Sequence, residues 1–156
     1  SAEQCTAGQR RLLVWPRSAA VVFDAPLPVD GKKLAELAAK QRETFGRPIS
    51  QHQVIAHKLA DAATELEAAR ALLQSVVWRI QHGEYPVAEI SMTKKYVAQV
   101  QNRVADTCLQ VHGGAGYMNE YEVSRQFRDA RLWRIGAGTD EVMNEVIAKR
   151  LGLGPA

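Results

Sequence analysis

The chain has little of what marks a membrane, secreted or nucleic-acid-binding protein. It contains no run of about 18 apolar residues, so no segment is expected to span a membrane. Residues 1–11 lack the charged start and apolar stretch of a signal peptide. The net charge of +3 is spread along the chain without a basic stripe among aromatics, so nucleic acid is not an expected partner. With only two cysteines, Cys5 and Cys108, we expect a reduced, cytoplasmic protein.

What the sequence does contain is an ordinary globular composition, arranged in two unequal parts. A hydrophobic fraction of 46% in 156 residues is enough for one domain with a real core. Residues 1–31 include two short apolar runs, Leu12–Trp15 and Ala19–Phe23, which suit strands, followed by a proline-containing turn or linker. This segment is either a strand pair or a remnant of a neighbouring domain. Residues 32–156 have a helical pattern throughout.

That second part predicts long antiparallel helices. The first helix ends at Phe45-Gly46, with Pro48 just beyond. A second helix, capped by Ser50, runs to about Gln81, and its apolar residues are spaced alternately four and three apart, as in a bundle seam. Pro86 opens a third helix, where its missing N–H costs nothing. The connection between these two helices is short, so they must be antiparallel.

Two shorter helices complete an all-α antiparallel four-helix bundle. They are predicted at about residues 122–133 and 139–151, the last one with Thr139 as its cap and Glu141 in its first turn, where the helix dipole favours a carboxylate. On the third helix, Cys108 is expected to lie in the core. The charged residues of that helix are expected to form a solvated surface: Lys94, Lys95, Arg103 and Asp106. No spacing of His, Cys and carboxylate residues indicates a metal site.

The third helix stops in a glycine-rich stretch, Gln110–Tyr117. Three glycines in four residues are unsuited to a helix interior, where each costs about 1 kcal/mol relative to alanine. One interpretation is a helix cap and tight turn, which is favoured for an isolated stretch of this kind. The other is a backbone cradle for a phosphate-bearing ligand. A second glycine loop, Ile135–Gly138, precedes the last helix, and the topology allows both loops to lie at one end, beside a helix N-terminus that suits an anion.

Four blocks of the sequence, taken in order, resemble the C-terminal domain of the acyl-CoA dehydrogenase family. They cover much of residues 34–151 and are Gln41–Gln53, Gln110–Tyr117, Arg128–Arg131 and Gly138–Glu141. The resemblance implies the four-helix bundle of that family, with FAD extended across a subunit interface. It also implies a dimer or tetramer, an acyl-CoA substrate and a place in fatty acid metabolism.

The resemblance also assigns cofactor contacts to particular residues. Arg42 matches the arginine that reaches the FAD pyrophosphate, whose oxygens suit a guanidinium, although an arginine at a helix end can also simply meet the dipole. The other matching positions are Thr44, Phe45, His52 and Gln53 near the second helix, Gln110, Gly113 and Gly114 for the adenosine half bound by a partner subunit, and Thr139 and Glu141. Together, these matches favour a cofactor cradle at the glycine stretch, a role compatible with capping.

Two departures from the family limit what is expected of this chain. The family's reaction removes an α-proton from an acyl-CoA thioester and passes a β-hydride to flavin, so it needs a carboxylate base. Many members carry a glutamate where this chain has Ala137, and others carry it on the first helix, where this chain has Trp15–Arg17; the nearest acids there are Asp24 and Asp30. In addition, the family's helical N-terminal domain and β-barrel have no counterpart in the sequence, so partner chains are expected to supply the base and the barrel.

Three functions follow as hypotheses. The first is a domain or subunit of an acyl-CoA dehydrogenase-like flavoprotein that contributes part of an FAD site. The second is a non-catalytic assembly module that retains the bundle for oligomerisation. The third is a repurposed enzyme on the same fold, with Asp24 or Asp30 as its acid or base, since one fold can host many chemistries.

Overall fold

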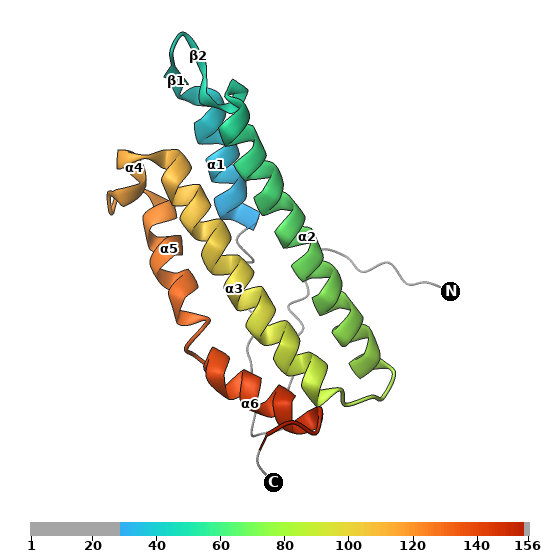
Figure 1. The fold of residues 1–156 in the computed structure, drawn as a ribbon. Helices are drawn as coiled ribbons and strands as arrows, with labels where there is room; N and C mark the ends of the chain where they lie inside the picture. The colour runs from blue at the N-terminus through green and yellow to red at the C-terminus, as the bar shows by residue number, and fades with distance from the viewer. Residues whose placement is uncertain (1–28, 155–156) are drawn as a thin grey trace.

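The computed structural model describes residues 29–154, which form a bundle of helices with one short hairpin (Figure 1). The elements in chain order are α1 (Val29–Gln41), β1 (Glu43–Thr44), β2 (Arg47–Pro48), a 3-10 turn (Ile49–Gln51), α2 (Gln53–Gln81), α3 (Val87–His112), α4 (Gly114–Tyr117), α5 (Glu122–Leu132) and α6 (Asp140–Arg150). The predicted all-α bundle is therefore confirmed. The expected strands before residue 24, and Asp24 itself, lie outside the described residues.

Helix α3 lies at the centre of the bundle and packs against α1, α2, α5 and α6. The predicted seven-residue spacing puts Val97, Val104 and Val111 on one face, two helical turns apart, and all three are buried. Cys108 is buried among them, as predicted, with 1% of its surface exposed. The facing helices contribute small side chains to the same core, including Ala35, Ala39, Ala62 and Ala69.

Helices α5 and α6 follow α3 in the opposite direction, one after the other. Asn102 ties α5 to α3, because its side-chain amide donates to the Ala130 carbonyl at 2.6 Å. Lys95 ties α6 to α3 by donating to Asn144 Oδ1 at 2.6 Å. The residues that leave α5 therefore lie beside the first half of α3, and the glycine stretch lies beyond its last turn (Figure 1).

Most helix ends agree with the sequence, but the end of α1 and the start of α2 differ. Helix α1 ends at Gln41 rather than at the predicted Phe45-Gly46, because residues 43–48 form the hairpin. The chain forms a 3-10 turn over Ile49–Gln51, with Ile49 buried, so α2 begins only at Gln53. Its N-cap is His52 rather than the predicted Ser50, and no side chain caps it. Thr139 does cap α6, since its hydroxyl accepts from the Val142 N–H at 3.4 Å. Helix α1 begins at Val29, inside the segment interpreted as linker.

The two glycine loops lie far apart along α3, one beyond its last turn and one beside its first half, so they do not lie at one end as the topology allowed. Helix α4 and the hairpin occupy one end, and α6 occupies the other (Figure 1). Lys94 of α3 contacts Gly138 of the second loop, whereas His112 ends α3 at the first. At about 1.5 Å per residue, the stretch of α3 between these two residues spans about 27 Å. The physical reason is that α5 carries the chain back along α3 before the second loop forms.

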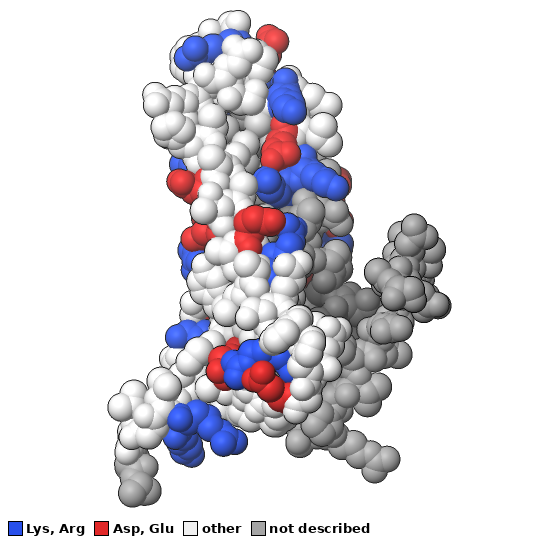
Figure 2. Space-filling model, turned by 90° about the vertical axis from the view of Figure 1, so that its right-hand side faces the viewer, with Lys and Arg blue, Asp and Glu red and all other residues white. Residues whose placement is uncertain are grey.

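The surface has mixed charge. On the face shown in Figure 2, basic and acidic side chains are interspersed, and no stripe of one sign runs along it. Ion pairs account for part of this pattern: Arg103 meets Glu65 at 3.0 Å and joins α3 to α2, and Arg79 meets Glu84 and Glu89, each at 2.6 Å. Among the helices of residues 29–154, none is long and apolar enough to cross a membrane.

Candidate functional site

The first candidate site forms where the end of α1 meets the glycine turn after α3. Arg42 directly follows α1, and its Nη1 donates to the His112 carbonyl at 3.2 Å. Gly113 has φ 61° and ψ −139°, a conformation that essentially only glycine adopts. A Cβ on Gly113 would lie 2.5 Å from Arg42 Nη1. The missing side chain therefore lets the guanidinium lie directly against the turn.

A cavity of about 520 Å³ opens beside this contact. Its lining comes from α1, the end of α3 and the segment that follows: Ala38, Gln41, Arg42, Val111, His112, Gly114, Ala115 and Tyr121. The lining combines a positively charged fork with glycine backbone and one aromatic side chain. Such a surface suits a ligand that carries phosphate and a flat ring, because a guanidinium matches phosphate oxygens in two-pronged geometry.

The hairpin next to this cavity is held by His52. Arg47 donates to His52 Nδ1 at 3.2 Å, and since an arginine cannot accept, this ring nitrogen must be the acceptor. The other nitrogen, Nε2, then carries the proton and donates toward Thr44, whose Oγ1 and carbonyl oxygen lie at 3.1 and 3.3 Å. At the tip, Phe45 has φ 53° and is 97% exposed. His52 thus braces the hairpin, while Phe45 projects from it.

Two further predicted residues flank the same end. Gln110 lies in the last turn of α3, and its carbonyl accepts the Gly113 N–H at 3.1 Å, while its side chain is exposed. Gln53 is the first residue of α2 and is also exposed. Eight of the ten predicted cofactor positions are therefore gathered around the α1 end, the hairpin and the glycine turn.

The remaining two predicted positions, Thr139 and Glu141, lie apart from these eight, at the start of α6. Glu141 is exposed, and hydrogen bonds from its own backbone N–H and from Thr139 hold its pKa below the ordinary value. Ala137, which the resemblance places at the family's usual base position, is exposed and has φ 56°. Its methyl group can neither donate nor accept a proton. A Cβ on Gly138 would lie 2.6 Å from Met143 Cε, so the loop packs closely onto α6.

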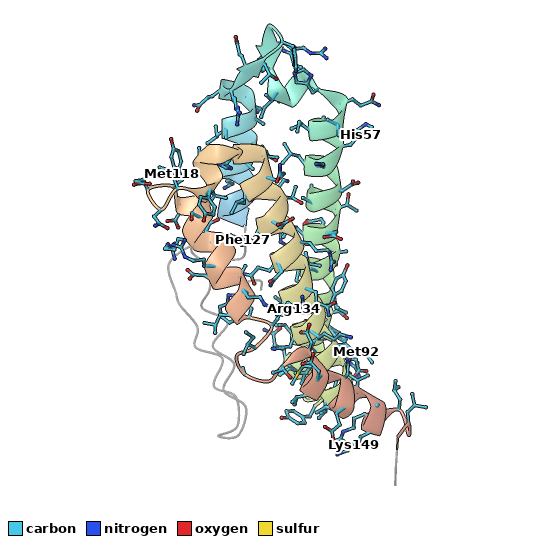
Figure 3. All side chains as sticks on the ribbon, turned by 60° about the vertical axis from the view of Figure 1, so that its left-hand side comes forward. His57, Met92, Met118, Phe127, Arg134 and Lys149 are labelled. Atoms are coloured by element: carbon cyan, nitrogen blue, oxygen red, sulfur yellow. The ribbon has the colours of Figure 1, made fainter. Side chains whose placement is uncertain are left out.

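Beneath this second loop lies a charged network that sequence reasoning missed. Lys94 was expected on the solvated surface, but it is only 7% exposed, and its ammonium donates to the Gly138 carbonyl. Asp140 is also buried, and it pairs with Arg134, whose Nε and Nη2 lie 2.7 and 2.6 Å from its Oδ2. Figure 3 shows Arg134 where the chain leaves α5 and turns toward α6. A signal was present, because Lys94 lies four residues after Ile90 and three before Val97, on the apolar face of α3.

The network also determines how its members ionise. Burial lowers the pKa of Lys94, and the negative charge of Asp140 offsets this only in part. Burial alone would raise the pKa of Asp140, but hydrogen bonds from Gln99 and Arg134, with the charges of Arg134 and Lys94, bring it below the ordinary value. Asp140 is therefore an anion held between cations, which makes it a poor proton acceptor near neutral pH. Within residues 29–154, no group of three or more His, Cys, Asp or Glu side chains is arranged to hold a metal.

These observations define a helical-bundle domain with an arginine-braced glycine turn. Residues 33–152 match the family model described as acyl-CoA dehydrogenase, C-terminal domain. The chain is 42% identical over 113 residues to the probable acyl-CoA dehydrogenase YngJ of Bacillus subtilis, a match that covers 72% of this chain and 30% of YngJ. It therefore belongs to the acyl-CoA dehydrogenase family, as the four sequence blocks predicted.

Solved structures agree with this assignment. A probable acyl-CoA dehydrogenase from Mycobacterium abscessus superposes with a TM-score of 0.77 at 45% identity, over 78% of this chain and 32% of that one. An FAD complex of PigA superposes with a TM-score of 0.75 at 28% identity, over 79% of this chain and 32% of PigA. The chain thus spans about a third of the length of these relatives.

Proposed function

We propose that this chain is the C-terminal domain, or a domain-sized subunit, of an FAD-dependent acyl-CoA dehydrogenase-like oxidoreductase. It contributes FAD contacts at the interface of a dimer or tetramer and acts on an acyl-CoA thioester in fatty acid metabolism, in a reduced, cytoplasmic setting. Family membership and the likeness to a flavoprotein in complex with FAD support the proposal. The single observation that carries it is the contact between Arg42 and the glycine turn at His112 and Gly113.

The residues at this contact fit the phosphate-bearing part of FAD. A side chain on Gly113 would fill the space that the Arg42 guanidinium occupies, so the turn is shaped around a cationic fork. Arg42 would hold pyrophosphate oxygens, and the backbone at Gly114, with Gln110 nearby, would approach the adenosine half. Phe45, exposed at the hairpin tip, would pack against the cofactor, a role that its near-complete exposure supports. When bound, the flavin would supply the acceptor for the hydride from the acyl β-carbon.

The distance between the two residue groups supports an oligomer. The contact group at Arg42 lies at the end of α3 and the group at Thr139 lies beside its first half, about 27 Å away along the helix. If FAD lies across a subunit interface, each chain contributes the residues around Arg42 to one FAD molecule and those around Thr139 to another. This arrangement explains how one domain can carry both groups although they do not meet.

At the second loop, the described residues are suited to bind and orient rather than to accept the proton. Ala137 cannot accept it, while Asp140 is paired with Arg134 and Glu141 has a lowered pKa. We therefore place the catalytic base on another chain or domain of the assembly. The repurposed-enzyme hypothesis stays a prediction: Asp24 lies outside the described residues, and Asp30 lies in the first turn of α1.

A second candidate function is a non-catalytic assembly module. The exposed Ala137 at the usual base position favours it, because this end of the chain lacks the group that the reaction needs. Under this hypothesis, the bundle serves oligomerisation alone and the contacts around Arg42 have no cofactor to hold.

An FAD titration separates the two. The full chain, alone and with its assembled partners, is titrated with FAD while light scattering gives its mass. We expect an FAD-loaded oligomer, and an affinity reduced about tenfold or more by Arg42→Met, since a hydrogen bond to a charged group contributes about 1.5–3 kcal/mol. Arg70→Met is the matched control, because Arg70 is paired with Glu67 on α2. Equal affinity in both variants would reject Arg42 as the phosphate contact, and no FAD bound to the wild type would reject the flavoprotein role and leave the assembly module.

A further inference from the structure

The charged network under the second glycine loop begins with an unusual lysine. Lys94 projects from α3, its side chain is buried, and its ammonium donates to the Gly138 carbonyl. Burying an ammonium is costly unless charges and hydrogen bonds compensate it. The compensating charge is the carboxylate of Asp140, the first residue of α6. Lys94 therefore bridges the centre of the bundle and the loop that precedes α6.

The loop is also closed on itself. Arg134 and Asp140 stand on either side of Ile135–Thr139, and their ion pair joins the two ends of that segment. Gln99, a second residue of α3, donates to the same oxygen of Asp140 at 3.2 Å. One ion pair thus joins the ends of the loop, and two hydrogen bonds connect this region to α3. Of these two, the bond from Gln99 ends on the Asp140 side chain, and the bond from Lys94 ends on the loop backbone at Gly138.

Helix stability does not account for the choice of lysine here. A cation beside the N-terminus of α6 opposes the helix dipole, which favours anions there. Replacing a buried ion pair as a whole by apolar residues is often neutral or stabilising. The loop, in turn, holds Ala137 at φ 56°, a conformation unfavourable for a residue with a side chain. The bond to the next residue, Gly138, opposes the relaxation of that backbone.

We propose that Lys94 is a positioning residue, which fixes the loop that presents Thr139 and Glu141 by holding the Gly138 carbonyl. This inference rests on the proposed function only in assigning those two residues to FAD. The mechanical part, that Lys94 restrains the loop, stands on the geometry of this chain alone. The two parts can therefore be tested separately.

The test compares Lys94→Met with Lys95→Met in the full chain. Lys95 is the matched control, because it is the next residue and also bonds α6, through Asn144, without touching the loop backbone. Hydrogen exchange followed by NMR reports on the Met143 amide, which donates to the Thr139 carbonyl at 3.0 Å. We expect this amide to exchange about tenfold faster or more in Lys94→Met and within about twofold of wild type in Lys95→Met. The Gly116 amide, at the far glycine turn, should not change in either.

Urea unfolding of the same variants separates restraint of the loop from support of the whole fold. We expect Lys94→Met to unfold at a urea concentration close to that of wild type, because the cost of burying the ammonium is removed and Asp140 keeps its ion pair with Arg134. Global destabilisation, with equally faster exchange at Met143 and Gly116, would overturn the positioning role, as would unchanged exchange at Met143.

FAD binding to the assembled protein tests the link to the cofactor. We expect an affinity about tenfold lower in Lys94→Met and unchanged in Lys95→Met. If the loop loosens but FAD affinity stays at the wild-type value, Lys94 does not act on the cofactor site. If the wild type binds no FAD, the proposed function fails, and the exchange data still decide whether Lys94 restrains the loop.

Discussion

Replacing Gly113 with alanine perturbs the contact on which the first site depends. The new Cβ would lie 2.5 Å from Arg42 Nη1, closer than real Cβ atoms come to any neighbour. The backbone at Gly113 also has a conformation, φ 61° and ψ −139°, that alanine disfavours. Two separate costs therefore arise at one position, one from the neighbour and one from the backbone.

The two costs can be sized. Backbone strain of this kind amounts to about 1–3 kcal/mol. The Arg42 guanidinium is the end of a flexible, exposed side chain, so it moves away and loses its bond to the His112 carbonyl, at about 0.5–1 kcal/mol. The sum is about 1.5–4 kcal/mol, which for a chain of this size lowers the midpoint of thermal unfolding by about 5–12 °C.

Gly114→Ala is the matched control, because a Cβ there meets nothing within 4 Å and the backbone has no positive φ. Thermal and urea unfolding of both variants should show a large loss for Gly113→Ala and little change for Gly114→Ala. Repeating Gly113→Ala in an Arg42→Ala background should recover about 0.5–1 kcal/mol, the coupling between the two residues. Equal stability of the two alanine variants, or a coupling of zero, would refute the reasoning about this turn.

Two further predictions concern the core and the second loop. Burial raises the pKa of the Cys108 thiol to about 11, so in a Cys5→Ser variant a thiol reagent at about pH 8 should react only after unfolding; rapid reaction of the folded protein would contradict this. Asp140→Asn should cost about 1–2 kcal/mol at neutral pH, because it removes the anion between Arg134 and Lys94. Since the folded pKa of Asp140 is lowered, this contribution is complete above the unfolded value of about 3.9 and is lost as pH falls through the folded one. The difference in unfolding free energy between wild type and variant, measured with urea, should therefore be constant from about pH 5 to 7 and shrink below about pH 4. A difference that persists in strong acid would contradict this role of Asp140.

The sequence predicted the helices well because their signals are local. The seven-residue spacing along the third helix marked the buried face that includes Val104, and Pro86 marked where that helix begins. Thr139 was recognised as a cap from its place before a helical run, and the structure confirms its bond to the Val142 N–H. The prediction at Ser50 was wrong because residues 49–51 form a 3-10 turn with Ile49 packed in the core, a tertiary contact that local patterns do not indicate.

The candidate site could be predicted only as a set of positions. Order and residue type indicated Arg42 and the glycine stretch, but the bond between Arg42 and His112 joins residues far apart in the chain. Likewise, His52 was expected to contact the cofactor, while in the structure its ring bonds Thr44 and Arg47 and so braces the hairpin. Such pairings depend on how helices pack, which the spacing within one helix does not specify.

By itself, the sequence determined which segments are helical, where most of them stop and which family blocks they carry, because periodicity, caps and glycines act over a few residues. The tertiary structure alone decided that the two glycine loops lie far apart along α3 (Figure 1) and that Lys94 is buried beneath one of them. Both outcomes arise because α5 runs back along α3. The loop after α5 and helix α6 then cover the first half of α3. A lysine that looks exposed on a helix becomes part of the interior when another segment packs over it.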